Sequence, residues 1–280
     1  MTKLKLTRRD FLRGMAAAPL LAVSATSLYA SLIEPHSYHI IETNILVPEL
    51  PAAFEGFRIA QITDVHHSRI VPIAEVHRVV EAAMKTKPDL IALTGDYTTS
   101  YRRYIEPCAE ALGELSAPEG VWAVLGNHDH YTDPLLTVRA LKRHRVSVLE
   151  NANTAITRGG DTLQLLGIGD WTWGRADWAR ALHGVDKRRP SVMLSHQPVV
   201  LDLPEAEGVS LILSGHTHGG QVSLPLVGPP IRYGRDFKYV QGLYEKNGTQ
   251  LYVSAGTGVI GLPVRLGVRP EISVLKLKRA

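Results

Sequence analysis

The sequence predicts an α/β fold in which two stacked β-sheets are flanked by helices on their outer faces. In the first half of the chain, short apolar runs typical of buried strands alternate with helical patterns. This alternation favours parallel strands, because a parallel neighbour requires a crossover connection. Strand patterns follow one another more closely in the second half, which indicates a second and more antiparallel sheet. A chain of 280 residues that is 45% hydrophobic is long enough to bury the core of such a fold.

The first half is expected to contain three strand–helix units. The run FRIAQITD gives the first strand, and the helix after it has apolar side chains at helical spacing. The runs DLIALTGD and GVWAVLGNHD repeat the pattern of an apolar strand followed by glycine and polar residues. The expected strands begin at residues 57, 89 and 120, and the expected helices cover 72–85, 103–115 and 134–143.

The second half is expected to be richer in strands, with one helix over 176–183. Residues 34–56 contain three prolines and are expected to form a connecting segment, so that the folded domain covers 57–280. The expected strands of the second half are 146–149, 163–168, 192–195, 211–214, 239–244, 250–254 and 271–277.

The formal net charge of +4 lies entirely in the first 30 residues. The remainder of the chain is formally neutral, which gives no support for a surface that binds nucleic acid, and no such partner is expected. The charged residues of this N-terminal part are Lys3, Lys5, Arg8, Arg9, Asp10 and Arg13.

Residues 1–33 have the architecture of an export signal. The stretch TRRDFL (7–12) resembles a twin-arginine signal, and an uncharged segment over 14–33 follows it. This resemblance implies export to the periplasm or to the outer face of the cell membrane. Residues 28–30 match a cleavage site only weakly, and 20 uncharged residues are long enough to span a bilayer. The segment is therefore expected to be either a cleaved signal or a retained membrane anchor.

Polar residues that bind metals or transfer protons follow five of the predicted strands. Because the carboxyl ends of parallel strands meet at one edge of an α/β sheet, these side chains are expected to converge there. They are Asp64, His66, Asp96, Asn127, His128, His196, His216 and His218.

The donor set of this cluster favours transition metals. It offers carboxylates, imidazoles and one amide, and Cys108 is the only cysteine of the chain. This composition is too rich in nitrogen for Ca²⁺ or Mg²⁺ and lacks the sulfur of most structural zinc sites, so it suits Mn, Fe, Zn or Co ions. One ion does not need seven ligands, whereas two ions that share a carboxylate use them all. Two ions about 3.5–4 Å apart acidify a bridging water and bind a phosphoryl group.

Five blocks in this sequence resemble the signature of the calcineurin-like metallophosphoesterases. They are DVH (64–66), GD (95–96), GNHD (126–129), SHQP around His196 and GHTH (215–218). Their order matches that family, and the resemblance extends from residue 57 to the C-terminus. It implies a four-layer α/β/β/α sandwich made of two mixed sheets flanked by helices.

The resemblance also implies a role for each residue. His128 is expected to protonate the leaving oxygen rather than bind metal, with Asp129 fixing its tautomer, and a metal-bridging hydroxide is the expected nucleophile. One ion is expected on Asp64, His66 and His218, a second on Asn127, His196 and His216, and Asp96 is expected to bridge the two.

The segments HTHGGQ (216–221) and RPEI (269–272) resemble a bacterial branch of phosphodiesterases that carry a twin-arginine signal or associate with membranes. This implies a phosphodiesterase or pyrophosphatase acting on a phosphoester, lipid-linked or derived from the envelope, with membrane association through the N-terminus. A UDP-2,3-diacylglucosamine pyrophosphatase of lipid A biosynthesis is the alternative, but its substrate is made in the cytoplasm, which conflicts with export. A non-catalytic scaffold is disfavoured, because every ligand and His128 are present.

Four further features adjoin the five blocks. His67 and His130 follow two of them and are candidates for contact with substrate. Trp171 and Trp173 are expected either to line the rim of the substrate site or to pack in a turn, and packing in a turn is favoured. The segments 224–231 and 258–264 are unusually apolar, which fits contact with acyl chains or a membrane, although packed turns are favoured for them as well.

Overall fold

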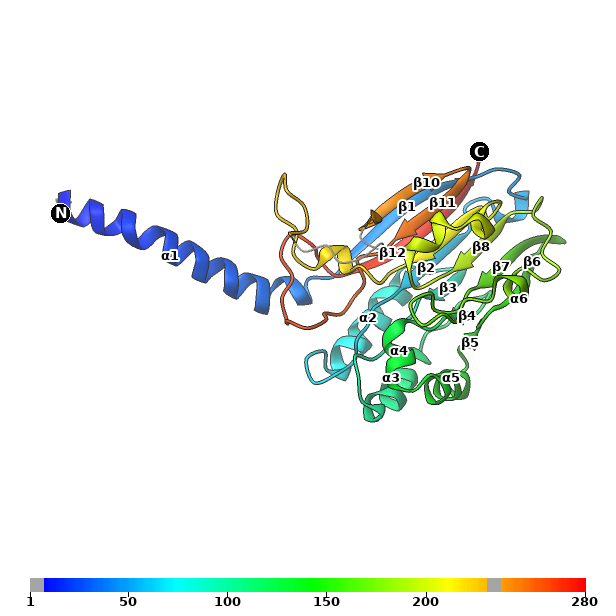
Figure 1. Ribbon diagram of the computed structural model, residues 1–280, viewed down its shortest axis with the longest axis horizontal. Helices are drawn as coiled ribbons and strands as arrows, with labels where there is room; N and C mark the ends of the chain where they lie inside the picture. Colours follow the sequence, from blue (N-terminus) through cyan, green and yellow to red (C-terminus); the bar gives the residue numbers. More distant parts are fainter. Residues whose placement is uncertain (1–7, 231–237) are drawn as a thin grey trace.

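The computed structural model of the chain describes residues 8–230 and 238–280. Two six-stranded mixed sheets lie face to face, with helices on their outer faces, as the sequence predicts (Figure 1). The N-terminal helix α1 (Arg8–Leu32) projects away from this body.

The first sheet has the strand order β1-β12-β2-β3-β4-β5. Strands β2 to β5 are parallel and connected through helices, β12 is antiparallel to β2, and β1 is parallel to β12. Its strands are β1 (His39–Val47), β2 (Arg58–Ile62), β3 (Leu90–Leu93), β4 (Val121–Ala123), β5 (Ser147–Val148) and β12 (Glu271–Arg279).

The second sheet has the order β10-β11-β9-β8-β7-β6. Its central strands β11, β9, β8 and β7 are parallel, and an antiparallel strand closes each edge. Its strands are β6 (Ala152–Arg158), β7 (Asp161–Gly167), β8 (Ser191–Leu194), β9 (Leu211–Ser214), β10 (Gly242–Lys246) and β11 (Thr249–Val253).

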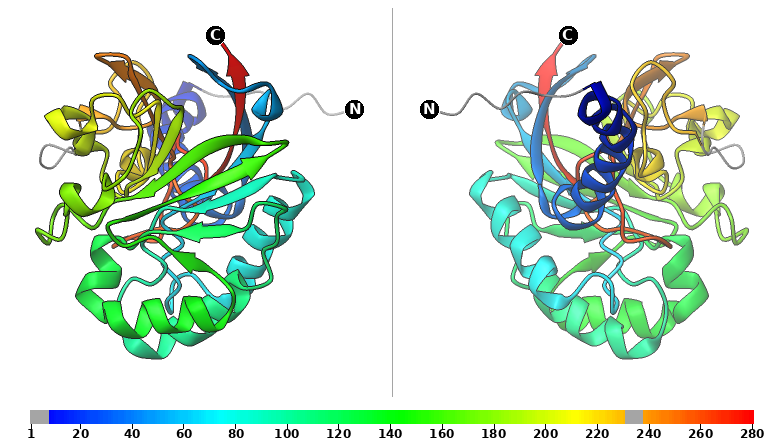
Figure 2. Two further views of the ribbon diagram at one scale, coloured as in Figure 1. Left: turned by 90° about the vertical axis from the view of Figure 1, so that its right-hand side faces the viewer. Right: turned by 90° about the vertical axis from the view of Figure 1, so that its left-hand side faces the viewer.

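Three hydrophobic layers hold the sandwich together. The layer between the sheets includes Ile59, Leu90 and Leu213, all of them buried. A second layer joins the first sheet to α2 (Ile73–Lys85), α3 (Ile105–Leu112) and α5 (Pro134–Arg143). The third lies beneath α6 (Trp178–Ala181) and the 3₁₀ turns Pro198–Asp202 and Pro204–Ala206 on the outer face of the second sheet. Figure 2 shows the longer helices along one outer face and these shorter segments along the other.

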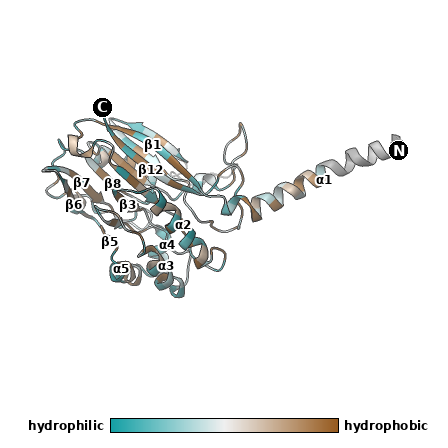
Figure 3. Ribbon diagram, turned by 180° about the vertical axis from the view of Figure 1, so that it is seen from behind, coloured by the Kyte–Doolittle hydropathy of each residue, from teal (hydrophilic) through white to brown (hydrophobic). Residues whose placement is uncertain are grey.

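The segment expected to connect the signal to the domain contains a strand. Residues 39–47 form β1, which pairs with the whole of β12 at the edge of the first sheet. Only Ile45 and Val47 of this strand are buried, and it mixes hydrophilic with hydrophobic residues (Figure 3). A half-exposed edge strand lacks the continuous apolar run of the central strands, and the prolines that suggested a connection lie outside it.

Smaller differences concern element boundaries. The helix expected from 103 is a 3₁₀ turn (Arg102–Tyr104) followed by α3, and the strand expected from 239 begins at 242. Strand β6 and helix α4 (Asn127–Thr132) were not expected. Only Ile156 of β6 is buried, so the strand lacks an apolar run, and α4 starts within the GNHD block.

The uncharged segment considered as an anchor forms most of α1, which contains Pro19. Among the helices in the described parts of the chain, none is both long enough and apolar enough to cross a bilayer.

Candidate metal centre

The candidate ligands lie in the loops that leave the carboxyl ends of the central strands. Asp64 and His66 follow β2, and Asp96 follows β3. Asn127 and His128 begin α4 after β4, His196 follows β8, and His216 and His218 follow β9. Both sheets therefore contribute to one site at a shared edge, as the sequence predicts.

Five of these residues have a left-handed backbone. Their φ angles are 53° for Asp64, 52° for His66, 57° for Asp96, 71° for His216 and 53° for His218. Positive φ is uncommon for residues other than glycine and costs of the order of 1 kcal/mol or more at each position. The fold sustains this strain where the side chains must turn into one small volume.

Two glycines allow the loops to approach one another closely. A Cβ atom on Gly215 would lie 2.2 Å from Oδ2 of Asp64, and one on Gly126 would lie 2.2 Å from Oδ1 of Asp96. Any side chain at either position would displace a carboxylate of the cluster. This explains why glycine precedes the histidines of GHTH and the asparagine of GNHD.

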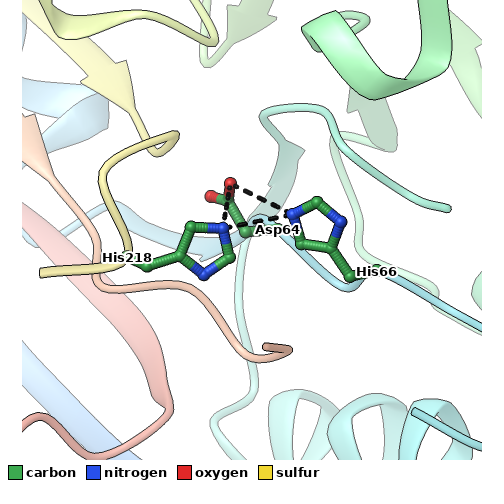
Figure 4. A group of neighbouring side chains, drawn as sticks. All are labelled: Asp64, His66 and His218. Atoms are coloured by element: carbon green, nitrogen blue, oxygen red, sulfur yellow. Dashed lines mark hydrogen bonds and ion pairs between the residues drawn. The ribbon is translucent and has the colours of Figure 1, made fainter. Parts of the chain in front are cut away.

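Asp64, His66 and His218 form the first group of donors (Figure 4). Nε2 of His218 lies 3.1 Å from Nε2 of His66 and 3.3 Å from Oδ1 of Asp64. Nδ1 of His218 is buried and has no hydrogen-bond partner among the residues that the structure describes. The Asp64 carboxylate is fixed from behind, because the hydroxyl of Thr63 donates to it at 2.7 Å and the backbone N–H of His216 donates at 3.0 Å.

Asn127, His196 and His216 form the second group. Oδ1 of Asn127 lies 3.0 Å from Nε2 of His196 and 3.0 Å from Nδ1 of His216. The two imidazole nitrogens are 3.2 Å apart. Nδ1 of His196 lies 2.8 Å from the carbonyl oxygen of Thr94, which directs Nε2 toward the other donors.

Asp96 lies between the two groups. Its Oδ2 atom is 3.5 Å from Nε2 of His66 in the first group and 3.3 Å from Nε2 of His196 in the second. A single carboxylate oxygen therefore faces both sets of donors.

The spacing of the donors is compatible with metal ligation. Two nitrogens bound at about 2.1 Å to one ion, at angles between those of an octahedron and a tetrahedron, are roughly 3.0–3.4 Å apart. The imidazole pairs His66–His218 and His196–His216 have separations of 3.1 and 3.2 Å. The described residues thus fit ions of the kind that bind imidazole and carboxylate together.

The protonation of the cluster is set by burial and by Asp96. Burial lowers the pKa of His66 and of His218 to about 3, which favours the neutral imidazoles that metal binding requires. Burial opposes ionisation of Asp96, but His196 and then His66 hold the pKa of its carboxyl well below the ordinary value. Asp96 therefore carries a negative charge between the two groups.

His128 lies beside the first group with its ring edge-on to His66, the centroids being 4.9 Å apart. Its Nδ1 atom is 2.7 Å from the carbonyl oxygen of Thr99, and its backbone N–H donates to Oδ1 of Asp96 at 2.8 Å. The Thr99 carbonyl fixes Nδ1 as the donor, so Nε2 is the atom left to exchange a proton with a substrate.

The expectation that Asp129 fixes the tautomer of His128 is wrong. Both oxygens of the buried Asp129 carboxylate accept backbone N–H groups, from Gly126 at 2.9 Å, Asp96 at 2.8 Å and Tyr97 at 3.0 Å. Asp129 therefore ties the loop after β3 to the start of α4. A carboxylate next to a histidine in sequence suggests a side-chain contact, but the first turn of α4 directs it toward the backbone instead.

The flanking histidines are packed rather than open. Nδ1 of His67 lies 2.9 Å from the carbonyl oxygen of Val71, and its ring packs against Tyr104. His130 has a side chain only 7% exposed, and its Nε2 atom is 3.8 Å from Oε1 of Glu150. Neither arrangement favours contact with a substrate.

Trp171 and Trp173 lie in a turn but remain 38% and 48% exposed. The indole N–H of Trp173 donates to the backbone carbonyl of Asn127 at 3.1 Å. Trp173 therefore lies at the rim of the site. This was the less favoured of the two positions expected from the sequence.

Arg265 was not anticipated from the sequence. It is fully buried, and its guanidinium donates to the carbonyls of Ala255, Gly256, Gly258 and Val268 at 2.6–3.3 Å. A Cβ atom on Gly256 would lie 2.7 Å from Cβ of Asp64, so this loop packs directly behind a candidate ligand. No local pattern distinguishes such an arginine from a surface one.

Comparison with known proteins identifies the family of this site. Residues 57–220 match the family described as Calcineurin-like phosphoesterase. The chain belongs to the calcineurin-like phosphoesterase family. It is 34% identical to the metallophosphoesterase YkuE of Bacillus subtilis, over 98% of each chain. It is 31% identical to Phosphodiesterase YaeI of Escherichia coli, over 97% of this chain and 99% of that one.

The fold of this calcineurin-like phosphoesterase is also found among solved structures. The sulfate thiohydrolase SoxB of Thermus thermophilus aligns with a TM-score of 0.50 at 15% identity, over 82% of this chain and 58% of that one, which is evidence of a shared fold alone. Family membership and the named relatives make the protein a metal-dependent phosphoester hydrolase.

Proposed function

We propose that the protein is a phosphodiesterase that uses two metal ions, one on each group of donors, with Asp96 shared between them. The observation that carries the proposal is the position of Oδ2 of Asp96, within 3.5 Å of an imidazole nitrogen in each group. Two ions held here would supply an acidified water as nucleophile and bind the phosphoryl oxygens. The donor set fits Mn, Fe or Zn.

His128 acts as the proton donor in this proposal. Water adds to phosphorus with loss of one proton to solvent, the ester P–O bond breaks, and the leaving oxygen takes a proton from Nε2 of His128, which regains one from solvent. The Thr99 carbonyl holds Nδ1–H and stabilises the imidazolium before transfer. Asp96 fixes the backbone of His128 and so sets the position of the acid relative to the donors.

The preference for diesters is tested with two chromogenic substrates on the purified protein. Hydrolysis of bis-p-nitrophenyl phosphate that requires Mn²⁺ and exceeds hydrolysis of p-nitrophenyl phosphate supports the proposal. The pyrophosphatase alternative uses the same site and differs in its substrate. Release of UMP from UDP-glucose without hydrolysis of the diester would favour that alternative.

Export by the twin-arginine route is proposed as well. Arg8 and Arg9 stand at the start of α1, and Cys108, the only cysteine, is buried, so no disulfide has to form after export. Replacing Arg8 and Arg9 by lysine should retain the protein in the cytoplasmic fraction. An unchanged distribution between cell fractions would contradict this route.

A further inference from the structure

An apolar groove opens directly beside the metal centre. It has a volume of about 320 Å³, and its lining includes His216 and His218. The lining also includes Val222, Ile260, Leu262 and Val264. Among the described residues, a molecule in this groove contacts two candidate ligands and otherwise only uncharged groups.

The two loops that form the groove are joined to each other. The side-chain amide of Gln221 donates to the carbonyls of Ile260 and Leu262, both at 3.1 Å, and accepts the N–H of Ile260 at 2.7 Å. Gln221 lies three residues after His218, so the wall of the groove is held in register with the metal-binding loop.

The apolar side chains at the tips of these loops are exposed rather than packed. Leu226 is fully exposed, Leu262 is 70% exposed and Val227 is 66% exposed. No charged residue occurs in 219–230 or in 255–264. Packed turns were the favoured expectation for these segments. It is wrong for the exposed tips, whereas Val259 in the second segment is buried. Exposed apolar groups without charged neighbours in their own segments favour contact with an apolar partner at these loops.

The apolar surface continues onto the end of α1. The backbone N–H of Arg265 donates to the carbonyl of Ala30 at 2.9 Å, which fixes the end of α1 against the second loop. Leu28, Leu32 and Ile33 are more than half exposed there. Figure 1 shows α1 and both loops on the same side of the molecule.

We propose that the groove binds the alkyl or acyl chain of an amphiphilic phosphodiester whose phosphoryl group lies at the metal centre. This inference rests on the proposed function and specifies its substrate class. The groove shares His216 and His218 with the metal centre, so an apolar chain joined to a phosphoester is the occupant that fills both at once. A membrane surface alone, or a second copy of the chain, would cover the loop tips but would not use the interior of the groove.

The inference is tested with a series of p-nitrophenyl phosphodiesters whose second ester group is methyl, butyl or octyl, each kept below its critical micelle concentration. The Mn²⁺-loaded full chain should show kcat/KM rising by about fourfold for each methylene that the groove buries. We expect at least a roughly tenfold rise from methyl to octyl. The rise should come mainly from a lower KM, since the chain is remote from the reacting bond.

Leu262→Gln and Leu135→Gln form a matched pair for this test. The two leucines are 70% and 71% exposed, but Leu135 lies on α5, away from the groove. Leu262→Gln should reduce the octyl-to-methyl ratio of kcat/KM by roughly threefold or more, and Leu135→Gln should leave the ratio unchanged.

A flat series with good hydrolysis of the methyl ester would overturn the inference and leave the proposed function standing. No hydrolysis of any ester by metal-loaded protein would remove the proposed function as well. A flat series together with vesicle binding that is lost in Leu262→Gln would assign the loops to a lipid surface. A flat series with a dimer that is lost in Leu262→Gln would assign them to a second copy, and both of these results overturn the substrate site.

Discussion

The backbone N–H of His128 donates a hydrogen bond of 2.8 Å to the carboxylate of Asp96. The other oxygen of this carboxylate faces His66 and His196. One side chain thus orients the proposed acid and faces both groups of donors. In the proposed mechanism, metal binding and proton transfer would therefore be coupled through Asp96.

Asp96→Asn should lower both the metal content and the turnover. The amide keeps one oxygen but removes the negative charge between two sets of imidazoles, so at least one ion should be lost and kcat should fall by roughly 10²-fold or more. Metal analysis by mass spectrometry and diester hydrolysis measure the two effects. The matched control is Asp161→Asn, which changes a partly exposed carboxylate on β7. This variant should keep the metal content and the turnover of the wild type.

His128→Ala should show whether His128 is a proton donor or a metal ligand. We expect kcat to fall by roughly 10²–10⁴-fold, because a positioned proton donor is lost, while the metal content stays unchanged. A substrate with a good leaving group needs less protonation, so the loss should be smaller for a p-nitrophenyl ester than for an alkyl one. An empty site in His128→Ala would show that His128 is a ligand instead.

Arg265→Met should destabilise the protein by about 3–5 kcal/mol. The change removes a buried cation and leaves several buried carbonyl groups without a donor. Arg265→Lys should retain only a small part of the stability that Arg265→Met loses, since one ammonium group cannot replace the planar set of guanidinium donors. Denaturant unfolding measures these changes, and the exposed Arg139→Met should stay within about 0.5 kcal/mol of the wild type.

Arg265→Met should also lower the affinity of the protein for metal. Its loop packs behind Asp64 through Gly256, so loosening it should weaken metal binding even under conditions where Arg265→Met remains folded. Destabilisation with unchanged metal affinity would limit Arg265 to a structural role.

Glu150→Gln should stabilise the protein above neutral pH. Burial, and then the charge of Asp170, raise the pKa of Glu150 to about 7, and within the described parts of the chain its Oε2 atom has no hydrogen-bond partner. A raised carboxyl pKa means that the folded state binds the proton more tightly. Stability is then highest below the unfolded pKa of about 4.3 and falls as the pH rises to about 7.

Glu150→Gln has no carboxyl group to ionise, so its stability does not fall in this pH range. The stability of the variant relative to the wild type should therefore increase from pH 4 to pH 7 and reach about 1–2 kcal/mol after allowance for partial exposure. Thermal unfolding at several pH values measures the difference. Parallel stability curves for Glu150→Gln and the wild type would show that Glu150 does not titrate in this way. The exposed Glu110→Gln should change stability by less than about 0.5 kcal/mol at every pH.

The sequence predicted the central strands and the convergence of the candidate ligands because both depend on local patterns. An apolar run ending in a polar cluster marks a buried strand and its loop, and the direction of a parallel sheet brings such loops together. The order of five such blocks was sufficient to predict which residues meet.

What was missed depends on contacts between distant parts of the chain. Strand β1 is defined by its pairing with β12, more than 200 residues away, and not by its own hydrophobicity. The partners of the Asp129 carboxylate and the burial of Arg265 follow from backbone groups, which have no signature in the side chains of a sequence.

The two-metal proposal is tested by the metal content of the purified protein, measured alongside its diesterase activity. The proposed site predicts about two ions per chain, loss of both ions and of activity on chelation, and recovery of both with Mn²⁺. One ion per chain with full activity would contradict the sharing of Asp96 between two metals. Diester hydrolysis that survives complete removal of metal would show that the protein does not use metal ions for this reaction.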